Sequence, residues 1–149
     1  VNHFKSKGYG NQDSSARKRW LQAESVRRIV ERLELEKASL VAVVGDFNDT
    51  PDSAPLAPLL HESGFKDVFA HKNFDNGGRP GTFGRCSERD KIDYILLSPA
   101  LFERVKTGGV WRKGIWGPNK KPLWEVYPEM KQSFHAASDH GCVWCELEV

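Results

Sequence analysis

The chain has 149 residues, which corresponds to a single domain at about 150 residues per domain. Its 39% hydrophobic and 28% charged residues exclude an intrinsically disordered chain, and its formal net charge of +2 excludes a polycation. Any binding of phosphate or nucleic acid must therefore depend on where individual charges lie. The longest aliphatic run, residues 40–44, is far shorter than the about 20 residues of a membrane-spanning helix, so we expect no membrane span.

The first third of the chain predicts a strand, a long helix and a second strand. Residues 1–5 have the pattern of a strand end, and residues 7–14 that of a loop. Ser14 or Ser15 is the expected cap of a helix that runs to about Lys37. Apolar residues at spacings of three and four predict one buried stripe along this helix, formed by Trp20, Ala23, Val26, Val30 and Leu33.

The remaining elements complete a layered α/β pattern. The aliphatic run at 40–44 is typical of a strand buried on both faces. Residues 53–60 predict a short helix, residues 91–98 a strand, and residues 141–149 a final strand. Turns are expected at 73–84, and the segment from Gly108 to Pro128 is expected to be irregular. Helices that alternate with buried strands indicate an α/β domain, in which the long helix makes a crossover between the first two strands.

The three cysteines do not predict a disulfide. Cys142 and Cys145 lie within the last predicted strand, where three residues of extended chain separate their Cα atoms by about 10 Å and place their side chains on opposite faces. Cys86 has no partner nearby in sequence. We therefore expect structural thiols.

Two polar residues follow the aliphatic strand directly, in the sequence Gly45-Asp46-Phe47-Asn48. Asp46 and Asn48 share a face on extended chain and emerge at the carboxyl end of a core strand, where α/β sheets bind ligands. The carboxylate suits a cation or a water molecule, and the amide suits a phosphoryl oxygen. The alternative is an Asx turn that closes the strand.

A second group of polar residues precedes the last strand, in Ser138-Asp139-His140. The Asp139 carboxylate is a ligand for a hard cation, and the His140 imidazole is a general base near neutral pH. Because neighbouring side chains point apart on extended chain, we expect them to serve separate roles. A polar turn is the alternative.

Asp93 lies within the apolar strand at 91–98, where an unpaired carboxylate would be costly. We expect a partner such as an imidazole or Arg, and His140 is the candidate, because an Asp–His pair orients the ring and stabilises its protonated form. A salt bridge with Lys91 or Arg89 is the alternative. His3, at the end of the first strand, is a candidate acid or oxyanion donor, with a structural histidine as the alternative.

The order of these motifs resembles that of the endonuclease/exonuclease/phosphatase superfamily, which includes deoxyribonuclease I-like nucleases and inositol polyphosphate phosphatases. The resemblance spans the chain and is carried by Asn2-His3-Phe4-Lys5-Ser6, Gly45-Asp46-Phe47-Asn48, Ile92-Asp93-Tyr94 and Ser138-Asp139-His140, with Thr82-Phe83 after the turn-rich loop. The first motif looks most like that of bacterial extracellular nucleases.

This resemblance implies a four-layer α/β sandwich of two mixed sheets and metal-assisted hydrolysis of a phosphoester. By position, His140 matches the base that activates water, and Asp93 matches the carboxylate that orients it. Asp46 and Asn48 match the residues that position the nucleophile at the metal site, and Asp139 matches a carboxylate associated with the metal. His3 matches a histidine that contacts the phosphate. The implied cofactor is Mg²⁺, with Mn²⁺ or Ca²⁺ as alternatives.

The resemblance begins in the middle of the family pattern, whose first half carries an Asn and a metal-binding Glu. We therefore expect residues 1–149 to be the carboxyl-terminal half of one longer domain. Such a half sandwich exposes apolar sheet surface, which predicts association with the missing N-terminal half or self-association. The compartment is left open, because the chain opens at Val1 without a secretory signal and a targeting segment can have been removed.

Basic residues gather between Arg104 and Trp124, a segment that contains six of them, no acidic residue and three tryptophans. Such a segment suits a nucleic-acid groove, with Arg112, Lys113 and the amide of Asn2 as candidate substrate contacts. A solvated loop anchored by buried indoles is the alternative. A further basic triplet, residues 17–19, lies near the start of the long helix, where cations oppose the helix dipole, so we expect it to serve a partner or a tertiary carboxylate.

The function that these patterns favour is a metal-dependent phosphoester hydrolase, with a nuclease as the leading activity. A phospholipid or inositol-phosphate phosphoesterase would use the same chemistry on another substrate. A non-catalytic interaction domain or fragment is the third hypothesis, because the metal-binding Glu of the family is absent from these residues.

Overall fold

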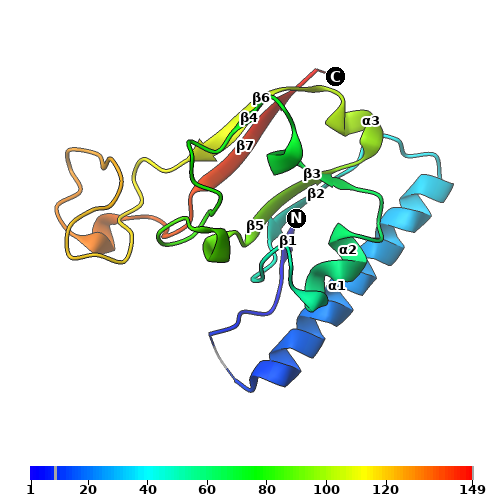
Figure 1. Ribbon diagram of the computed structural model, residues 1–149, viewed down its shortest axis with the longest axis horizontal. Helices are drawn as coiled ribbons and strands as arrows, with labels where there is room; N and C mark the ends of the chain where they lie inside the picture. The colour runs from blue at the N-terminus through cyan, green and yellow to red at the C-terminus, as the bar shows by residue number, and fades with distance from the viewer. Residues whose placement is uncertain (9, 149) are drawn as a thin grey trace.

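The computed structural model describes residues 1–8 and 10–148; Tyr9, in a predicted loop, and Val149, at the end of the last predicted strand, lie outside the described residues. The strands form two mixed sheets (Figure 1). The first sheet contains, in spatial order, β1 (Asn2–His3), β2 (Ala42–Asp46), β5 (Asp93–Leu97) and β3 (Lys66–Asp67). The second contains, in spatial order, β4 (Phe74–Asp75), β6 (Val105–Trp111) and β7 (Cys142–Leu147).

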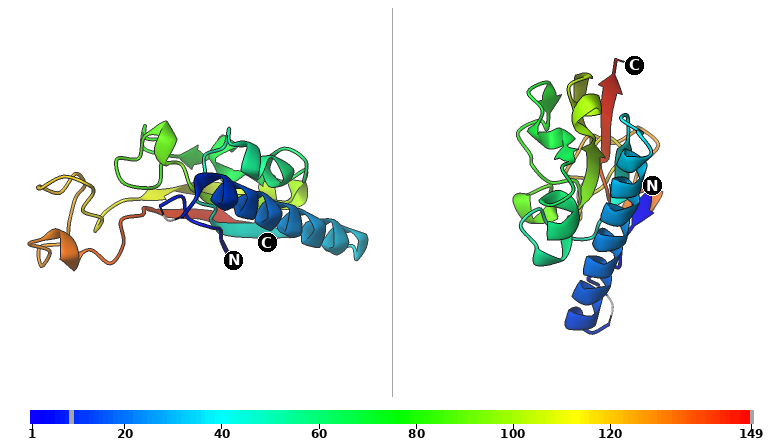
Figure 2. Two further views of the ribbon diagram at one scale, coloured as in Figure 1. Left: turned by 90° about the horizontal axis from the view of Figure 1, so that it is seen from below. Right: turned by 90° about the vertical axis from the view of Figure 1, so that its right-hand side faces the viewer.

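The helices confirm the α/β class. They are α1 (Gln12–Leu35), α2 (Ala57–Leu60) and α3 (Pro99–Phe102), with short 3-10 helices at Ala54–Leu56, Val68–Ala70, Glu88–Asp90 and Ser133–His135. β1 and β2 are parallel and joined by α1, as the predicted crossover requires, whereas β2 and β5 are antiparallel. In both views of Figure 2, the green segments, which include α2, lie on the side of the molecule away from the N-terminus.

Two apolar clusters hold these layers together. The first packs α1 and α2 against one face of the first sheet and includes Ala23, Val43, Leu59, Tyr94 and Leu96. The second joins Leu97 and Ile95 of β5 to residues of β6 and β7. The two sheets are therefore linked through β5, whose alternating side chains enter both clusters.

α1 begins earlier than the sequence predicts. The side chain of Asn11 accepts a hydrogen bond from the main-chain N–H of Ser14 at 3.1 Å, so Asn11 is the cap and the prediction of Ser14 or Ser15 was wrong. The basic triplet at 17–19 consequently lies beyond the first turn, where the opposition between cations and the helix dipole is weaker.

The buried stripe of α1 also differs from the predicted one. Ala23 and Val30 are buried as expected, but Trp20 is 44% exposed and Arg19 takes the buried position instead. Arg19 is 3% exposed because its guanidinium donates to the carboxylate of Asp49 at 2.8 Å. An amphipathic pattern cannot reveal this burial, since a buried cation requires a partner that is distant in sequence.

The prediction that β2 is buried on both faces was wrong for this chain. Val43 is buried against the helices, whereas Ala42 is exposed and Val44 is half-buried on the other face. Trp144 of β7 is also 40% exposed. The expected exposure of apolar sheet surface is thus present, and association with a missing half or a second copy stays a prediction.

β6 overlaps the segment that was predicted to be irregular, and that prediction was wrong at residues 108–111. Gly108 and Gly109 weaken a strand pattern, but here they allow β4 to approach β6 closely. A Cβ atom on Gly108 would lie 2.8 Å from the ring of Phe74, and one on Gly109 would lie 2.8 Å from the carbonyl oxygen of Asp75.

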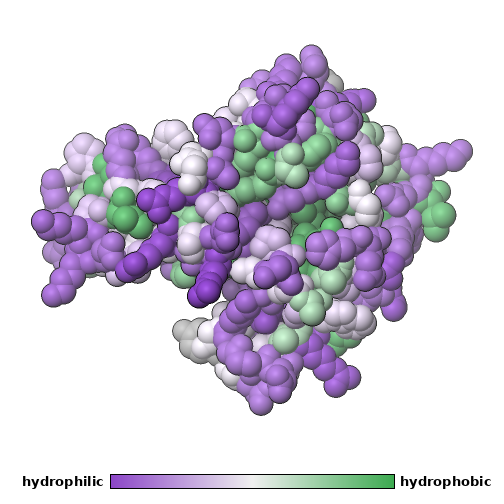
Figure 3. Space-filling model, viewed as in Figure 1, coloured by the Kyte–Doolittle hydropathy of each residue, from purple (hydrophilic) through white to green (hydrophobic). Residues whose placement is uncertain are grey.

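Residues 112–139, named the arm below, project from the two sheets (Figure 1). In Figure 3 the visible face of the arm is mainly hydrophilic. Trp116 is buried and its indole N–H donates to the carbonyl of Asn119 at 3.2 Å, whereas Tyr127 and Phe134 are exposed. Trp116 is therefore buried as the alternative interpretation of this segment proposed, whereas Trp111 is 55% exposed.

Two further expectations concern membranes and thiols. Among the residues that the structure describes, no helix is long and apolar enough to cross a bilayer. All three cysteines are free thiols, and Cys142 is exposed while Cys145 is half-buried, as their alternation along β7 predicts.

Candidate active site

The site begins where β2 ends, at a glycine that lets β1 approach. Gly45 has a φ of +147°, and a Cβ atom at this position would lie 1.8 Å from the carbonyl oxygen of Asn2. β1 pairs with β2 in the register that places His3 opposite Asp46. The His3 Nε2 atom lies 3.7 Å from Asp46 Oδ2. Gly45 therefore brings the His3 imidazole to the Asp46 carboxylate.

The Asp46 carboxylate is held by Asn48, two residues further along the chain. Asn48 has a φ of +54°, and its main-chain N–H donates to Asp46 Oδ1 at 2.7 Å. Its side-chain amide donates to Asp46 Oδ2 at 3.0 Å and to the carbonyl oxygen of Phe4 at 3.1 Å. The proposed Asx turn is thus present, and it fixes the carboxylate at the strand end.

Asp93 and His140 form the expected pair. His140 Nδ1 lies 3.0 Å from Asp93 Oδ2 and 3.2 Å from Oδ1. The Thr82 hydroxyl donates to Asp93 Oδ2 at 2.6 Å and accepts a hydrogen bond from the Asp93 main-chain N–H at 3.1 Å. The contact with Asp93 raises the pKa of His140, against the opposing effect of burial.

The loop that carries Thr82 also positions His140 directly. Phe83 and His140 form an antiparallel bridge, their ring centroids lie 5.0 Å apart, and the main-chain N–H of Gly141 donates to the Thr82 carbonyl at 2.6 Å. Thr82 is fully buried. No role was predicted for Thr82 and Phe83. Only the fold shows that the short loop containing them contacts both Asp93 and His140.

Asp46 and Asp93 face each other across β2 and β5, where they are Cα partners. One ligand atom each from Asp46, Asp93 and His140 lie within 4.8 Å of one another. Burial is the main cause of a raised pKa at Asp46, and the negative charge of Asp93 adds to it, while the N–H of Asn48 opposes it. A cation bound beside Asp46 would oppose this rise and favour its ionised carboxylate, so Asp46 fits the role of a metal ligand.

The other predicted metal and substrate residues lie around this cluster. Asp139 is exposed, and its carboxylate approaches His140 Nε2 to 3.8 Å, which is beyond hydrogen-bond distance. The His3 side chain is 76% exposed, and Asn2 is half-buried beside Gly45. The edge formed by β1, β2 and β5 therefore combines two carboxylates that are fixed by hydrogen bonds, those of Asp46 and Asp93, with side chains that are exposed to solvent.

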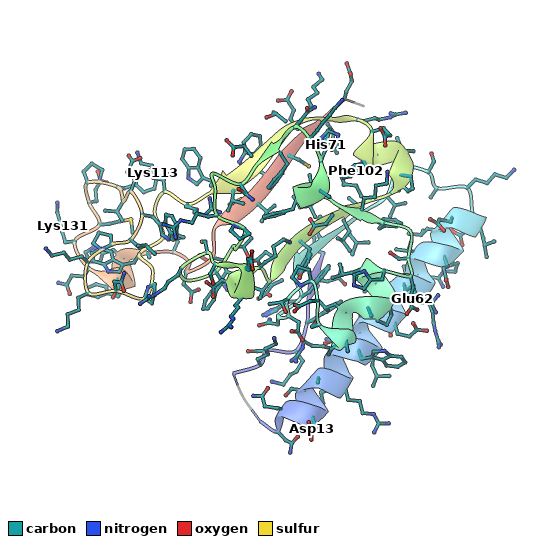
Figure 4. The ribbon with its side chains drawn as sticks, viewed as in Figure 1. Asp13, Glu62, His71, Phe102, Lys113 and Lys131 are labelled. Atoms are coloured by element: carbon teal, nitrogen blue, oxygen red, sulfur yellow. The ribbon has the colours of Figure 1, made fainter. Side chains whose placement is uncertain are left out.

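Arg112 and Lys113 lie at the start of the arm and have partners within the chain. The Arg112 guanidinium donates to three main-chain carbonyl oxygens, of Asn76, Arg79 and Gly81, at 2.8–3.1 Å. The Lys113 ammonium group pairs with the carboxylate of Glu125. Arg112 thus braces the turn that leads into Thr82. In Figure 4, Lys113 and Lys131 on the arm lie away from Asp13 at the beginning of α1.

The alternative partners proposed for Asp93 do not bind its carboxylate. The ammonium group of Lys91 donates to the main-chain oxygen of Asp93 at 2.6 Å and pairs with the carboxylate of Asp67 at 3.0 Å. Arg89 is exposed. Lys91 is buried, and this burial lowers its pKa despite the carboxylate of Asp67.

A buried ion pair beneath the site was missed at the sequence level. Besides its bond with Asp49, the Arg19 guanidinium donates to the carbonyl of Lys5 at 3.1 Å, and Lys7 also pairs with Asp49. The Tyr94 hydroxyl donates to the Asp49 carbonyl at 2.8 Å. The triplet at 17–19 therefore supplies a cation to a tertiary carboxylate, as one of its two interpretations proposed, and this pair joins α1 to the loop after Asn48.

Comparisons with known proteins agree with this geometry. The family model "Endonuclease/Exonuclease/phosphatase family" matches residues 5–140. An endonuclease/exonuclease/phosphatase family protein from Bacteroides thetaiotaomicron superimposes with a TM-score of 0.52 at 22% identity, over 64% of this chain and 34% of that chain. The 3′ phosphatase NExo from Neisseria, bound to product DNA hairpin, superimposes with a TM-score of 0.56 at 18% identity, over 97% of this chain and 57% of that chain.

The chain thus spans between about a third and somewhat more than half of the length of these two structures, and their identities support the fold alone. A search of curated proteins gave no match. The family model covers most of the chain, including His140 and both central carboxylates. The chain therefore belongs to the endonuclease/exonuclease/phosphatase family.

Proposed function

We propose that this site hydrolyses phosphoesters with the help of a divalent metal ion. The observation that carries the proposal is the Asp93–His140 pair, held within 4.8 Å of the Asp46 carboxylate at one edge of the sheet. Membership of a family of phosphoester hydrolases supports the reaction class. The geometry supplies a base, an orienting carboxylate and a second carboxylate in one cluster.

His140 is the proposed general base. Because its Nδ1–H donates to Asp93, the Nε2 atom is the acceptor that can take a proton from an attacking water molecule. Asp93 favours the imidazolium that results, as the raised pKa of His140 reflects. Asp46 orients the water, and the His3 imidazole stabilises negative charge on the phosphoryl oxygens from the accessible side.

A metal ion would be held by Asp46, the Asn48 amide oxygen and Asp139. Carboxylate and amide oxygens are the ligands that Mg²⁺ prefers, and Mg²⁺ keeps several water molecules when proteins supply few ligands. When bound, such an ion neutralises charge on the phosphoryl group. We propose Mg²⁺ as this ion, with Mn²⁺ or Ca²⁺ as substitutes.

A nuclease is the proposed activity within this reaction class. The reactive edge is accessible rather than enclosed, since His3 and Asp139 are 76% and 71% exposed, and such an edge suits a long substrate. The Neisseria 3′ phosphatase was solved with a DNA hairpin product, which supports nucleic acid as the substrate class.

Hydrolysis of bis(4-nitrophenyl) phosphate with and without MgCl₂ tests the reaction class. We expect Mg²⁺-dependent release of nitrophenol that EDTA abolishes, and a rate about 10²–10⁴-fold lower for His140→Ala. His61→Ala is the matched control, because His61 is also exposed to solvent but lies at the end of α2. Equal rates for wild type and His140→Ala, with unchanged thermal unfolding, would contradict the proposal.

A further inference from the structure

The main chain of Asp93 lies at a point where β5 extends beyond its neighbour β3. β3 pairs with Leu96 and Leu97 and ends before it reaches Asp93. On the other side of β5, the main-chain N–H of Phe47 donates to the carbonyl of Ile92 at 2.8 Å, so this carbonyl faces β2. Because successive residues of an antiparallel strand direct their main-chain groups to opposite sides, those of Asp93 face the side that β3 leaves open.

Two side chains take the place of a strand at this point. The main-chain N–H of Asp93 donates to the Thr82 hydroxyl at 3.1 Å, and its carbonyl oxygen accepts a hydrogen bond from the Lys91 ammonium group at 2.6 Å. Thr82 also donates to the Asp93 carboxylate, whereas the bond from Lys91 goes to the main chain. The residue that orients His140 is therefore held through both of its main-chain groups.

The Lys91 ammonium group is itself fixed in place. Lys91 is 4% exposed, and its Nζ atom lies 3.0 Å from Oδ2 of Asp67, the last residue of β3. The other carboxylate oxygen of Asp67 accepts a hydrogen bond from the main-chain N–H of Phe69 at 3.2 Å. The same Nζ atom lies 3.5 Å from the ring centroid of Tyr94 and 4.1 Å from that of Phe69, and aromatic faces attract a cation. The end of β3 and two rings therefore determine where Lys91 donates.

We propose that Lys91 is a positioning residue for His140, and that it acts through the main chain of Asp93. Stability alone does not require a buried ion pair, since apolar side chains of similar volume often stabilise a fold equally well. An apolar side chain cannot donate to the Asp93 carbonyl, however, and a displacement of about 1 Å at a reacting group can lower a rate 10²-fold. The inference rests on the proposed function, in which His140 is the general base.

The kinetic test removes the ion pair as a unit, in the variant Lys91→Met/Asp67→Asn. No buried charge is left unpaired, and the new amide oxygen can still accept the hydrogen bond from Phe69, so the unfolding temperature should stay close to that of wild type. We expect kcat for bis(4-nitrophenyl) phosphate to fall about 10–10²-fold while KM is unchanged. Lys91→Met alone should lower both kcat and the unfolding temperature, because it leaves the Asp67 carboxylate without its partner. Lys91→Arg keeps a cation with N–H donors and should retain more of kcat than Lys91→Met.

Lys66→Met/Glu103→Gln is the matched control, because it removes a lysine–carboxylate pair beside the other end of β5. The Lys66 ammonium group lies 3.5 Å from the Glu103 carboxylate, and Lys66 is the Cα partner of Leu97. This variant should keep the kcat of wild type. Wild-type kcat in a folded Lys91→Met/Asp67→Asn variant would overturn the proposal, and so would an equal fall of kcat in the control.

A second measurement observes the His140 ring directly, without metal or substrate. A hydrogen bond from Nδ1–H to Asp93 favours the Nδ1–H tautomer of the neutral imidazole, and long-range ¹H–¹⁵N NMR correlations distinguish the two tautomers. Spectra are recorded in EDTA at a pH above the pKa of His140, and the spectrum of His140→Ala assigns the signals. We expect Lys91→Met/Asp67→Asn to lose the preference for this tautomer, and the control to keep it. An unchanged preference in the folded Lys91 variant would overturn the proposal.

The outcome for Lys91 is separable from the outcome for the proposed function. A tautomer preference that depends on Lys91, in a wild-type chain without Mg²⁺-dependent cleavage, would support the positioning of the imidazole and contradict the proposed function. Mg²⁺-dependent cleavage with the same kcat and the same tautomer in Lys91→Met/Asp67→Asn would support the reaction and overturn the role of Lys91.

Discussion

The proposed catalytic cluster, formed by Asp46, Asp93 and His140, differs from the arm in how its charged side chains are held. The side chains of Asp46 and Asp93 are 19% and 18% exposed, and each accepts hydrogen bonds from main-chain or side-chain donors on neighbouring segments. In the arm, Lys113 pairs with Glu125, whose side chain is 73% exposed. Charges of the cluster are therefore fixed before any ligand arrives, whereas the Lys113–Glu125 pair is open to solvent.

This difference supports our proposal that the reaction takes place at the sheet edge, and that the arm contributes mainly through its first residue. Arg112 binds the turn at 76–81, next to Thr82. Preorganised groups at developing charge give the largest catalytic effects, while exposed ion pairs contribute little free energy. Substitutions in the two regions should consequently differ by orders of magnitude.

Asp46→Asn is the substitution with the largest expected effect. It removes the charge that orients water and holds a cation but keeps the shape, so we expect kcat/KM for a phosphodiester to fall about 10³-fold. Glu125→Gln makes the same change in the arm and should leave kcat/KM unchanged. A similar decrease in kcat/KM in both variants would contradict the proposed difference between the sheet edge and the arm.

Arg19→Met tests the support beneath the cluster. The substitution leaves the buried carboxylate of Asp49 without its main partner, so we expect the free energy of unfolding to decrease by about 3–5 kcal/mol. Urea denaturation measures the change. Arg28→Met breaks the pair with Glu24 on the surface of α1, and it should cost less than about 1 kcal/mol.

Thr82→Val removes the hydroxyl that binds both the carboxylate and the main chain of Asp93. A hydrogen bond to a charged group stabilises a protein by about 1.5–3 kcal/mol, so we expect a loss of this size together with a lower kcat. Thr82→Ser keeps the hydroxyl and should restore kcat. An active Thr82→Val enzyme would mean that the Asp93–His140 pair needs no support from this loop.

The pH dependence of the free energy of unfolding should reflect the contact between Asp93 and His140. Because the folded pKa of His140 is raised, its contribution to stability is fully present below the unfolded pKa of 6.5 and is lost as pH rises through the folded value. We therefore expect the free energy of unfolding to decrease as the pH rises from about 6.5 through the folded pKa of His140. Chemical denaturation of Asp93→Asn should show a smaller decrease, and an identical decrease in both proteins would assign it to other groups.

Lys113→Gln is expected to have the smallest effect. Its partner Glu125 is largely exposed, so losing the pair should change the free energy of unfolding by less than about 1 kcal/mol. Oligonucleotide affinity measured on the same variant tests the proposed substrate contact of Lys113. An unchanged affinity would contradict this contact.

The sequence predicted the elements whose signals are local. The strand at 91–98, the short helix at 53–60 and the crossover by the long helix were all confirmed, because hydrophobic patterning and proline placement encode them directly. The pairing of Asp93 with His140 was also predicted, since a carboxylate in an apolar strand requires a partner and an Asp–His pair orients the imidazole.

The features that the sequence could not predict depend on contacts between distant segments. Burial of Arg19 is explained only by Asp49, and the glycines of β6 are explained only by the approach of β4. Thr82 gave no chemical signal of its own, because a threonine in a turn is common and its role depends on which carboxylate lies beside it. Local patterns therefore predicted which polar groups meet at the sheet edge, but not the residues that support them.

The close approach at Gly45 has a consequence for how this protein tolerates mutation. Even alanine would bring a methyl group within 1.8 Å of a main-chain oxygen, so β1 would have to move away and carry the imidazole of His3 with it. No larger amino acid relieves that overlap. A saturation library at this codon, selected for phosphoesterase activity, should return glycine alone. Position 45 can therefore serve as an internal standard for a fully intolerant position in mutational scans of this protein.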